Sequence, residues 1–386
     1  MLKKIEFLTS GESHGKALLG IIEGIPANIE ISEEYIKNHL IRRQVGYGRG
    51  KRMKIENDYA EIISGVRNGI TIGSPIGLMI NNNDWKNWKN KMPIKKNDND
   101  IKKVTLPRPG HADLAGIQKF GFDDIRNVIE RSSARETAMR VALGSISRKV
   151  LEDIGIEVGS RVVQIHNIID TNKISSYTSA NSISNEADMS AVRCLDEESS
   201  EKMIAIIDLA KSKGDSVGGV FEIIATGLPY GIGSYTQWNK KLNSKLAAMI
   251  MSINAFKSIE LGTGIKQANK FGSNIHDEIK WCNDSYTRPT NNAGGIEGGM
   301  SNAQPIIIRA SMKPIPTLTK PLQSIDIITH EEKLAHKERT DSCAVPAASI
   351  ITESMVCLTL LDSILEKFGG DSLQQLKDHI KISGRY

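Results

Sequence analysis

The pentapeptide GESHG at residues 11–15 places a serine and a histidine inside a glycine-rich segment. Its Gly-x-Ser-x-Gly spacing matches the nucleophile elbow of serine hydrolases, which requires a strand, a sharp turn and then a helix. Only one short apolar run, residues 5–9, precedes the motif, and the β-branched run at 16–26 is typical of a second strand. The pattern therefore favours a strand–loop–strand unit with His14 at its tip. A glycine-rich hairpin with an incidental histidine remains an alternative.

A second group, ERSSARETAMR at residues 130–140, combines two serines with arginines at a predicted helix start. Ser132 and Ser133 precede backbone amides that have no helical partner, and the helix dipole is positive at that end. Arg131 and Arg135 add guanidinium groups, which bind phosphate and carboxylate oxygens in a forked geometry. The pattern predicts an anion site, with an ordinary capped helix as the alternative.

Two glycine-rich segments are further candidates for ligand-binding loops. RRQVGYGRGKRM at residues 42–53 is basic but lacks the Gly-Lys-Ser/Thr ending of a P-loop. We interpret it as a loop that closes over an anion, with a solvated surface loop as the alternative. NNAGGIEGGMSNAQP at 291–305 has paired glycines, which allow backbone amides to line a planar or phosphate-bearing ligand. The stiff KPIPT turn follows at 313–317.

Proton-transfer candidates lie in predicted loops. His14 and His111 are in the glycine-containing segments ESHG and PGHAD, and histidine suits general acid catalysis near neutral pH. Arg339 and Asp341 are two residues apart, so in extended backbone they face the same side, and Asp341 is a candidate base. A surface ion pair is the alternative. Because no histidine spacing typical of zinc sites occurs, we expect no metal.

These candidates must be positioned by helices and strands that alternate irregularly along the chain. Ser32 is a predicted N-cap, and Ser133 and Glu136 have capping-box spacing. Helix signals occur at residues 31–44, 132–155, 200–214, 239–256 and 349–368, and a strand signal at 218–229. Without a regular βαβ period, the pattern predicts an α+β fold. We expect one domain over residues 1–386, with mobile loops near 43–53, 81–103 and 171–190.

Composition narrows the class of protein. The chain has 386 residues, 39% of them hydrophobic, a net charge of +5 and a pI near 8.8. This mild basicity suits small anions and argues against a nucleic-acid partner, although WKNWKNK at 85–91 interleaves aromatic residues with lysines as a single-strand binder does. Four widely spaced cysteines indicate a reducing cytoplasm. No signal peptide or membrane span is expected.

A series of segments occurs in the order and approximate spacing of one known family. They are TSGESHG, RRQVGYGRGKRM, RPGHADLAG, RSSARETAMR, GDSVGGV, SINAFKSIELG, GGIEGGMSN, MKPIPTL and RTDSCAVPAAS. Through this combination, which extends over residues 7–360, the chain resembles chorismate synthase. The resemblance implies that His14 is the working residue of GESHG and that Ser13 is not an acyl nucleophile.

The resemblance implies a lyase that removes phosphate from 5-enolpyruvylshikimate 3-phosphate by a 1,4-anti elimination to give chorismate, the last common step toward aromatic amino acids. The reaction needs reduced FMN although it has no net redox change. NADPH, or a separate flavin reductase as partner, is a candidate source of electrons. The resemblance also implies a β-α-β sandwich, with helices between two antiparallel sheets, and a cytoplasmic homotetramer.

Carried over by motif, His14 is the acid beside the leaving phosphate, His111 protonates or hydrogen-bonds reduced flavin near N1, and Asp341 is a base that acts through flavin N5. The arginines assigned to the substrate anions are Arg43, Arg49, Arg135 and Arg339. The flavin contacts are Arg131, Ser132, Ser133, Asn254, Ala255, Gly298, Lys313, Pro314, Ile315, Pro316, Thr317 and Arg339. In family members that bind NADPH, its assigned positions match Arg43 and Arg49.

Two positions depart from the family pattern. Members commonly read NHxGGIxGG and SNG, and here Asn292 stands at the His position and Ala303 at the Gly position. If that Gly needs a positive φ, Ala303 costs roughly 1 kcal/mol or more. We expect local loop geometry to differ while the activity is kept. A flavoprotein oxidoreductase that consumes NADPH is a further alternative, although no Gly-x-Gly-x-x-Gly fingerprint follows a strand.

Overall fold

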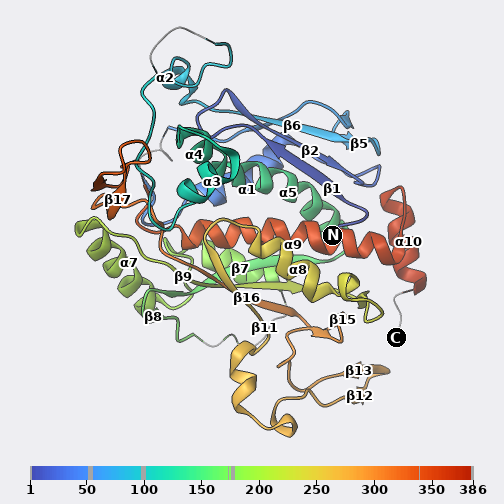
Figure 1. The fold of residues 1–386 in the computed structure, drawn as a ribbon. Coiled ribbons are helices and arrows are strands. Elements are labelled where there is room, and N and C mark those ends of the chain that lie inside the picture. The colour runs from blue at the N-terminus through green and yellow to red at the C-terminus, as the bar shows by residue number, and fades with distance from the viewer. Residues whose placement is uncertain are drawn as a thin grey trace.

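Two antiparallel β-sheets enclose a layer of helices in the computed structural model of this chain (Figure 1). The structure describes residues 2–50, 55–96, 101–172, 174, 179–338 and 340–383. In Figure 1 the first sheet lies above the helices and the second sheet below them. This arrangement confirms the expected α+β fold and its β-α-β sandwich.

The first sheet has the strand order β1-β2-β6-β3. Along β2, Leu18 and Ile22 are buried against the helices whereas Leu19 and Ile21 are exposed, because successive side chains of a strand point to opposite faces. The antiparallel β1–β2 pair confirms the predicted strand–loop–strand unit, with GESHG in its loop. The strands are β1 (Glu6–Ser10), β2 (Ala17–Glu23), β6 (Ile76–Asn81) and β3 (Ala60–Ile62).

The second sheet has the order β11-β16-β9-β7-β8. Its strands are β11 (Phe256–Leu261), β16 (Ile306–Met312), β9 (Gly219–Thr226), β7 (Glu157–Ile165) and β8 (Ile168–Ile169). A smaller sheet contains β10 (Tyr230–Gly233), β15 (Met300–Asn302) and β14 (Ile296–Glu297). Short antiparallel pairs are β4 (Val66–Arg67) with β5 (Ile70–Thr71), β12 (Lys280–Cys282) with β13 (Ser285–Thr287), and β17 (Gln323–Ile325) with β18 (Glu332–Leu334).

The central element of the helical layer is α9 (Val345–Phe368), which crosses the molecule between the sheets (Figure 1). By length and composition it could cross a membrane, but its apolar stretch is wholly buried inside the protein. Gly144 of α5 (Thr137–Asp153) lies so close to α9 that a Cβ there would be 2.5 Å from Ser354 Cβ. Gly144 therefore allows α5 and α9 to pack closely.

Some of the other helices pack against α9 and others against strands of the second sheet. They are α1 (Glu33–Gln44), α2 (Trp85–Trp88), α3 (Asp113–Phe120), α4 (Arg126–Ser132), α6 (Ala180–Asp188), α7 (Glu197–Ser212), α8 (Leu242–Met251) and α10 (Leu373–Ser383). Short 3₁₀ helices occur at Ala134–Glu136, Trp238–Lys240, Gly264–Asn269 and Gly272–Asn274. The predicted N-cap of α1 is confirmed, since Ser32 accepts a hydrogen bond from the Tyr35 amide.

The predicted helix at 132–155 is wrong at its start. Helix α4 ends at Ser132, Ser133 is extended, and α5 begins only at Thr137 after a 3₁₀ turn. The capping box is also absent, because the Glu136 carboxylate accepts from Thr9 and Arg140 and does not reach back to Ser133. At this break the backbone changes direction between α4 and α5. Tertiary contacts stabilise the broken arrangement relative to one continuous helix.

Other boundaries also differ from the prediction. The helix expected at 349–368 begins at Val345, with a proline in its first turn, and α10 was not expected. The segments 81–103 and 171–190 were expected to be loops, yet they contain α2 and α6 respectively. The mobility of these segments and of 43–53 stays a prediction.

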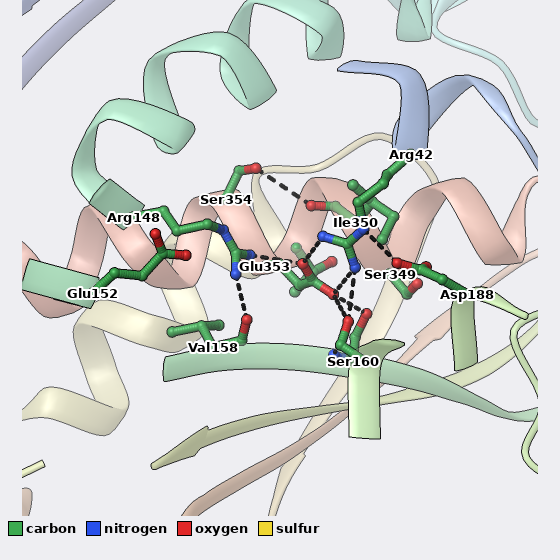
Figure 2. A network of polar contacts seen from close by, with 12 residues as sticks. Arg42, Arg148, Glu152, Val158, Ser160, Asp188, Ser349, Ile350, Glu353 and Ser354 are labelled. Carbon is green, nitrogen blue, oxygen red and sulfur yellow. Dashed lines mark hydrogen bonds and ion pairs between the residues drawn. The ribbon is translucent and has the colours of Figure 1, made fainter. Parts of the chain in front are cut away.

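A buried ionic network links the helical layer to the second sheet (Figure 2). Glu353 of α9 is fully buried, and its Oε2 lies 2.9 Å from Arg42 Nη1 and 2.6 Å from Arg148 Nη2. Burial alone raises the pKa of Glu353, but Arg42, Arg148 and Arg193 outweigh it and hold the pKa well below its usual range. Arg42 therefore anchors the end of α1, next to Arg43.

Candidate active site

A pocket of about 390 Å³ lies where the GESHG loop, the α4–α5 break, the start of α9 and the loop after β16 meet. Most of the residues singled out in the sequence line this pocket. These are His14, His111, Asp341, Arg43, Arg49, Arg135, Ser132, Ser133, Asn254, Ala255, Lys313, Ile315, Pro316 and Thr317. Segments far apart in the chain thus supply one cavity.

Four of the predicted residues are not among those that line it. Arg131 turns outward, and its Nη2 donates to the backbone oxygen of Thr9 at 2.7 Å. Gly298 lies between β14 and β15 with a φ of 59°, and Pro314 does not line the pocket although its neighbours do. Arg339 lies outside the described residues.

His14 is 4% exposed and fixed by Glu130 of α4. Its Nδ1 lies 2.9 Å from Glu130 Oε1, and its backbone amide donates to Oε2 at 2.7 Å. Since a carboxylate only accepts, the proton is assigned to Nδ1, which leaves Nε2 for the pocket. Burial alone raises the pKa of Glu130, but the hydrogen bonds from His14 outweigh it and lower the pKa.

A second layer of charge supports this pair. Arg126 Nη1 lies 3.3 Å from Glu130 Oε1 and 2.6 Å from Glu338 Oε1. Burial raises the pKa of Glu338, yet His336 and Arg126 lower it overall to about 2. Glu338 also lines the pocket, so a negative group faces the cations there.

His111 belongs to a triad built from the PGHAD turn. Its Nδ1 lies 2.5 Å from Asp113 Oδ1, and Arg108 Nε donates to Asp113 Oδ2 at 2.8 Å. Arg108 also donates to Thr317 Oγ1 at 2.9 Å, which connects this turn to the KPIPT segment. Burial opposes ionisation of Asp113, but the hydrogen bonds from His111 and Arg108 lower its pKa below its usual range.

Arg43 and Arg135 share one buried carboxylate. Asp58 Oδ1 lies 2.5 Å from Arg135 Nη1, and its Oδ2 lies 3.5 Å from Arg43 Nη1. Burial lowers the pKa of Arg43 to about 10, although Asp58 opposes that shift. Arg43 Nη1 and Arg135 Nη2 are buried and make no hydrogen bond within the described residues. Arg135 Nη2 also lies 3.6 Å from Glu56 Oε2, so both arginines are held by buried carboxylates where they line the pocket.

Part of the pocket lining is apolar. Ile253, Phe256, Met312 and Ile351 line it together with alanines from the first turn of α9. The backbone at the starts of α5 and α9 also faces this cavity, and helix starts favour negative charge. The pocket therefore suits a ligand with a flat apolar part and anionic groups.

Several residues in or beside the site were not predicted. Glu130 and Asp113 lie inside motifs discussed in the sequence analysis. In the sequence alone, however, a carboxylate beside arginines cannot be distinguished from an ordinary surface group. Asp58 and Asn82 lie in segments with no motif, and Asn82 Oδ1 accepts from Arg135 Nε at 2.9 Å. Trp88 lies in WKNWKNK, which the sequence relates only to nucleic-acid binding. Only the folded chain brings these residues to the pocket.

The two departures from the family pattern lie away from the pocket. Ala303 has a φ of 61°, so the position needs the left-handed conformation that glycine adopts without strain. The Asn292 amide donates to Asp277 Oδ1 at 2.8 Å, and its backbone oxygen accepts from the Thr263 amide at 3.0 Å. Neither residue lines the candidate site.

Comparisons with known proteins agree on one family. The sequence model described as chorismate synthase matches residues 5–365. The chain is 50% identical to chorismate synthase 2 of Bacillus cereus over 99% of both chains, and 49% identical to a chorismate synthase of Geobacillus sp. with the same coverage. A crystal structure of chorismate synthase matches with a TM-score of 0.80 and 40% identity, covering 99% of this chain and 98% of that one.

The family match runs through all the segments that build the pocket. The chain therefore belongs to the chorismate synthase family of lyases, which convert 5-enolpyruvylshikimate 3-phosphate into chorismate.

Proposed function

We propose that this pocket carries out the family reaction with reduced FMN bound beside the substrate. The observation that supports the proposal is that His14, His111, Asp341 and several arginines line one cavity with an apolar wall. Substrate and FMN both carry anionic groups, and the isoalloxazine ring is flat and largely apolar. The guanidinium groups of Arg43 and Arg135 and the apolar side chains fit such ligands.

In this proposal the substrate anions are held by Arg43, Arg49, Arg135 and Arg339. In a cavity with little water, preorganised cations stabilise anionic groups more strongly than they would in bulk solvent. Helix starts at α5 and α9 add partial positive charge. Together these groups orient the substrate and offset the charge that develops on the departing phosphate.

His14 is the proton donor to that phosphate. Glu130 fixes Nδ1, so that Nε2 of the protonated ring is the donor that reaches into the pocket. A positioned general acid contributes about 10²–10⁴ in rate. Asp341 is the proton acceptor at the other end of the elimination, and Arg49 orients its carboxylate through an ion pair at 2.9 Å.

When bound, reduced FMN would lend electron density to the substrate without net redox change. His111, oriented by Asp113, is the hydrogen-bond donor to the flavin. The residues that hold the cofactor are Ser132, Ser133, Asn254, Ala255 and the 313–317 segment. Arg131 and Gly298, which do not line the pocket of this chain, are the remaining flavin residues of the proposal.

We further propose that the protein is a cytoplasmic homotetramer. The outer face of the first sheet supports association, because Leu8 is 70% exposed and pairs with Ile21, which is 51% exposed. Exposed apolar patches on a sheet mark interaction surfaces. The electrons for FMN come from NADPH or from a separate flavin reductase. Light scattering coupled to size exclusion tests the tetramer.

The deciding experiment incubates the purified protein anaerobically with 5-enolpyruvylshikimate 3-phosphate and chemically reduced FMN. Phosphate release and the ultraviolet absorbance of the chorismate diene should rise in a one-to-one ratio, and oxidised FMN should give neither. Binding of both ligands without turnover would contradict the catalytic assignment. Stoichiometric NADPH consumption per turnover would favour an oxidoreductase instead.

A further inference from the structure

Trp88 lies against the imidazole of His14, although the sequence predicts no role for its segment in the site. The two ring centroids are 3.8 Å apart and the ring planes differ by 24°, which is a stacked geometry. Trp88 is the last residue of α2 and is partly buried, and His14 is 4% exposed. Trp88 is therefore part of the cover that separates the imidazole from bulk water.

The residues just before α2 fix it over the GESHG loop. Asn82 Nδ2 donates to the backbone oxygens of Gly15 at 2.9 Å and Glu12 at 3.2 Å. The same side chain accepts from Arg135 through Oδ1. Asp84, the residue before the helix, is 1% exposed. The stack therefore belongs to an anchored unit that includes the loop carrying His14.

The ring of Trp88 already attracts positive charge. The Arg126 guanidinium and Lys91 Nζ each lie 5.1 Å from a ring centroid. An aromatic face stabilises a nearby cation through its quadrupole, and a protonated imidazole is such a cation. Stacking on Trp88 therefore favours the charged form of His14.

Other charged groups also act on His14. Glu130 is hydrogen-bonded to Nδ1, and Glu338 and His14 interact electrostatically. Both carboxylates favour protonation of the ring. Arg126, which pairs with both carboxylates, and Lys91 oppose it. The contribution of Trp88 acts in addition to this partly balanced set of charges.

We propose that Trp88 is a positioning residue for His14. Its stacking fixes the imidazole with Nε2 available to the pocket, and its face stabilises the protonated ring that donates to the leaving phosphate. This inference rests on the role of His14 in the proposed function. It does not require Trp88 to touch the substrate.

The test compares two substitutions in the full chain labelled with ¹³C at histidine Cε1. Trp88→Leu keeps an apolar cover without an aromatic face, and Trp88→Phe keeps a smaller face. The NMR signal that disappears in His14→Gln reports His14. We expect its titration midpoint to fall by about one pH unit in Trp88→Leu and by less in Trp88→Phe. Trp85→Phe, at the other end of α2, is the matched control and should leave the midpoint unchanged.

The alkaline limb of the kcat profile should move with the NMR midpoint, because a general structural defect lowers kcat at every pH without moving the limb. An unchanged midpoint in Trp88→Leu, or an equal shift in Trp85→Phe, overturns the proposal. If the unsubstituted protein does not release phosphate, the proposed function fails instead. The NMR titration still decides in that case whether Trp88 controls the protonation of His14.

Discussion

Arg49 and Asp341, which both line the candidate site, form an ion pair with 2.9 Å between Nη1 and Oδ2. The second carboxylate oxygen accepts from the Gly50 amide at 2.6 Å. The proposed base is therefore held by the glycine-rich loop that also supplies a proposed substrate arginine. An anionic substrate that binds Arg49 would therefore change the interactions of both Arg49 and Asp341.

Substitution of the base should separate chemistry from binding. We expect Asp341→Asn to lower kcat by about 10²–10⁴, because the amide cannot accept the proton. Binding of FMN, measured by its fluorescence, should persist. Asp208→Asn, which changes an exposed carboxylate bonded to Tyr47, is the control and should retain turnover. Near-normal turnover in Asp341→Asn with flavin bound would remove Asp341 from the mechanism.

The shared carboxylate Asp58 should contribute strongly to stability in the absence of ligand. Asp58→Asn removes the carboxylate that the buried Arg43 and Arg135 share, although Glu56 Oε2 remains 3.6 Å from Arg135 Nη2. We expect the free energy of unfolding in urea to fall by about 3–5 kcal/mol. The matched control Asp123→Asn breaks an exposed pair with Lys103 and should leave stability unchanged.

Anions should rescue the Asp58→Asn variant selectively. Because the two guanidinium groups then lack their shared carboxylate, added 5-enolpyruvylshikimate 3-phosphate should raise its melting temperature more than that of the unsubstituted protein. An equal rise in both proteins would show that the two arginines do not bind the substrate anions.

His39 of α1 should make stability depend on pH in the mildly acidic range. Burial first, and then Arg148 and Arg42, lower the pKa of its imidazole from 6.5 to about 3. Below pH 6.5 His39 therefore binds a proton in the unfolded chain but not in the folded chain. The free energy of unfolding accordingly decreases as the pH falls from 6.5 toward 3. His39→Asn should reduce this slope by about 1.4 kcal/mol per pH unit.

Urea unfolding at intervals between pH 6.5 and pH 4.5 measures that slope, above the range where most carboxylates titrate. The exposed His276 provides the comparison, since His276→Asn should keep the slope of the unsubstituted protein. An unchanged slope in His39→Asn would mean that His39 is protonated in the folded state.

Ala303 should be a point of backbone strain. Ala303→Gly relieves a left-handed conformation that costs about 1–2 kcal/mol, while glycine adds about 0.5–1 kcal/mol of unfolded-state entropy. We expect the free energy of unfolding to rise by about 0.5–1 kcal/mol. Ala248→Gly, inside α8, should lower it by about 1 kcal/mol. A loss of stability in both variants would contradict the strain at Ala303.

The sequence predicts an element well where residues within a few positions of one another determine it. The N-cap at Ser32 and the β1–β2 hairpin follow from residue types within a few positions. The start of α5 does not, because Ser133 and Glu136 have capping-box spacing and yet Glu136 bonds to Thr9 of the first sheet. A contact between residues 127 positions apart decides that boundary, and no short segment contains it.

In the candidate site, too, residues within motifs could be predicted and residues defined by long-range contacts could not. His14, His111 and Asp341 were found because rare motifs surround them, and the fold brings all three to one pocket. Glu130, Asp58 and Trp88 could not be assigned, because their importance lies in which side chain each one contacts. Arg43 shows both cases, since its motif is visible in the sequence but its shared carboxylate is visible only in the structure.

The position of α9 in the chain has a consequence for biosynthesis. Residues 345–368 form the central helix of the layer, which packs on α5 and on the second sheet, and they leave the ribosome after all the strands of the described residues have been made. Until then the inner face of the second sheet, with side chains such as Phe221, lacks α9 as a partner and exposes apolar surface. We therefore expect nascent chains that stop before α9 to depend on chaperones, and released fragments of that length to aggregate.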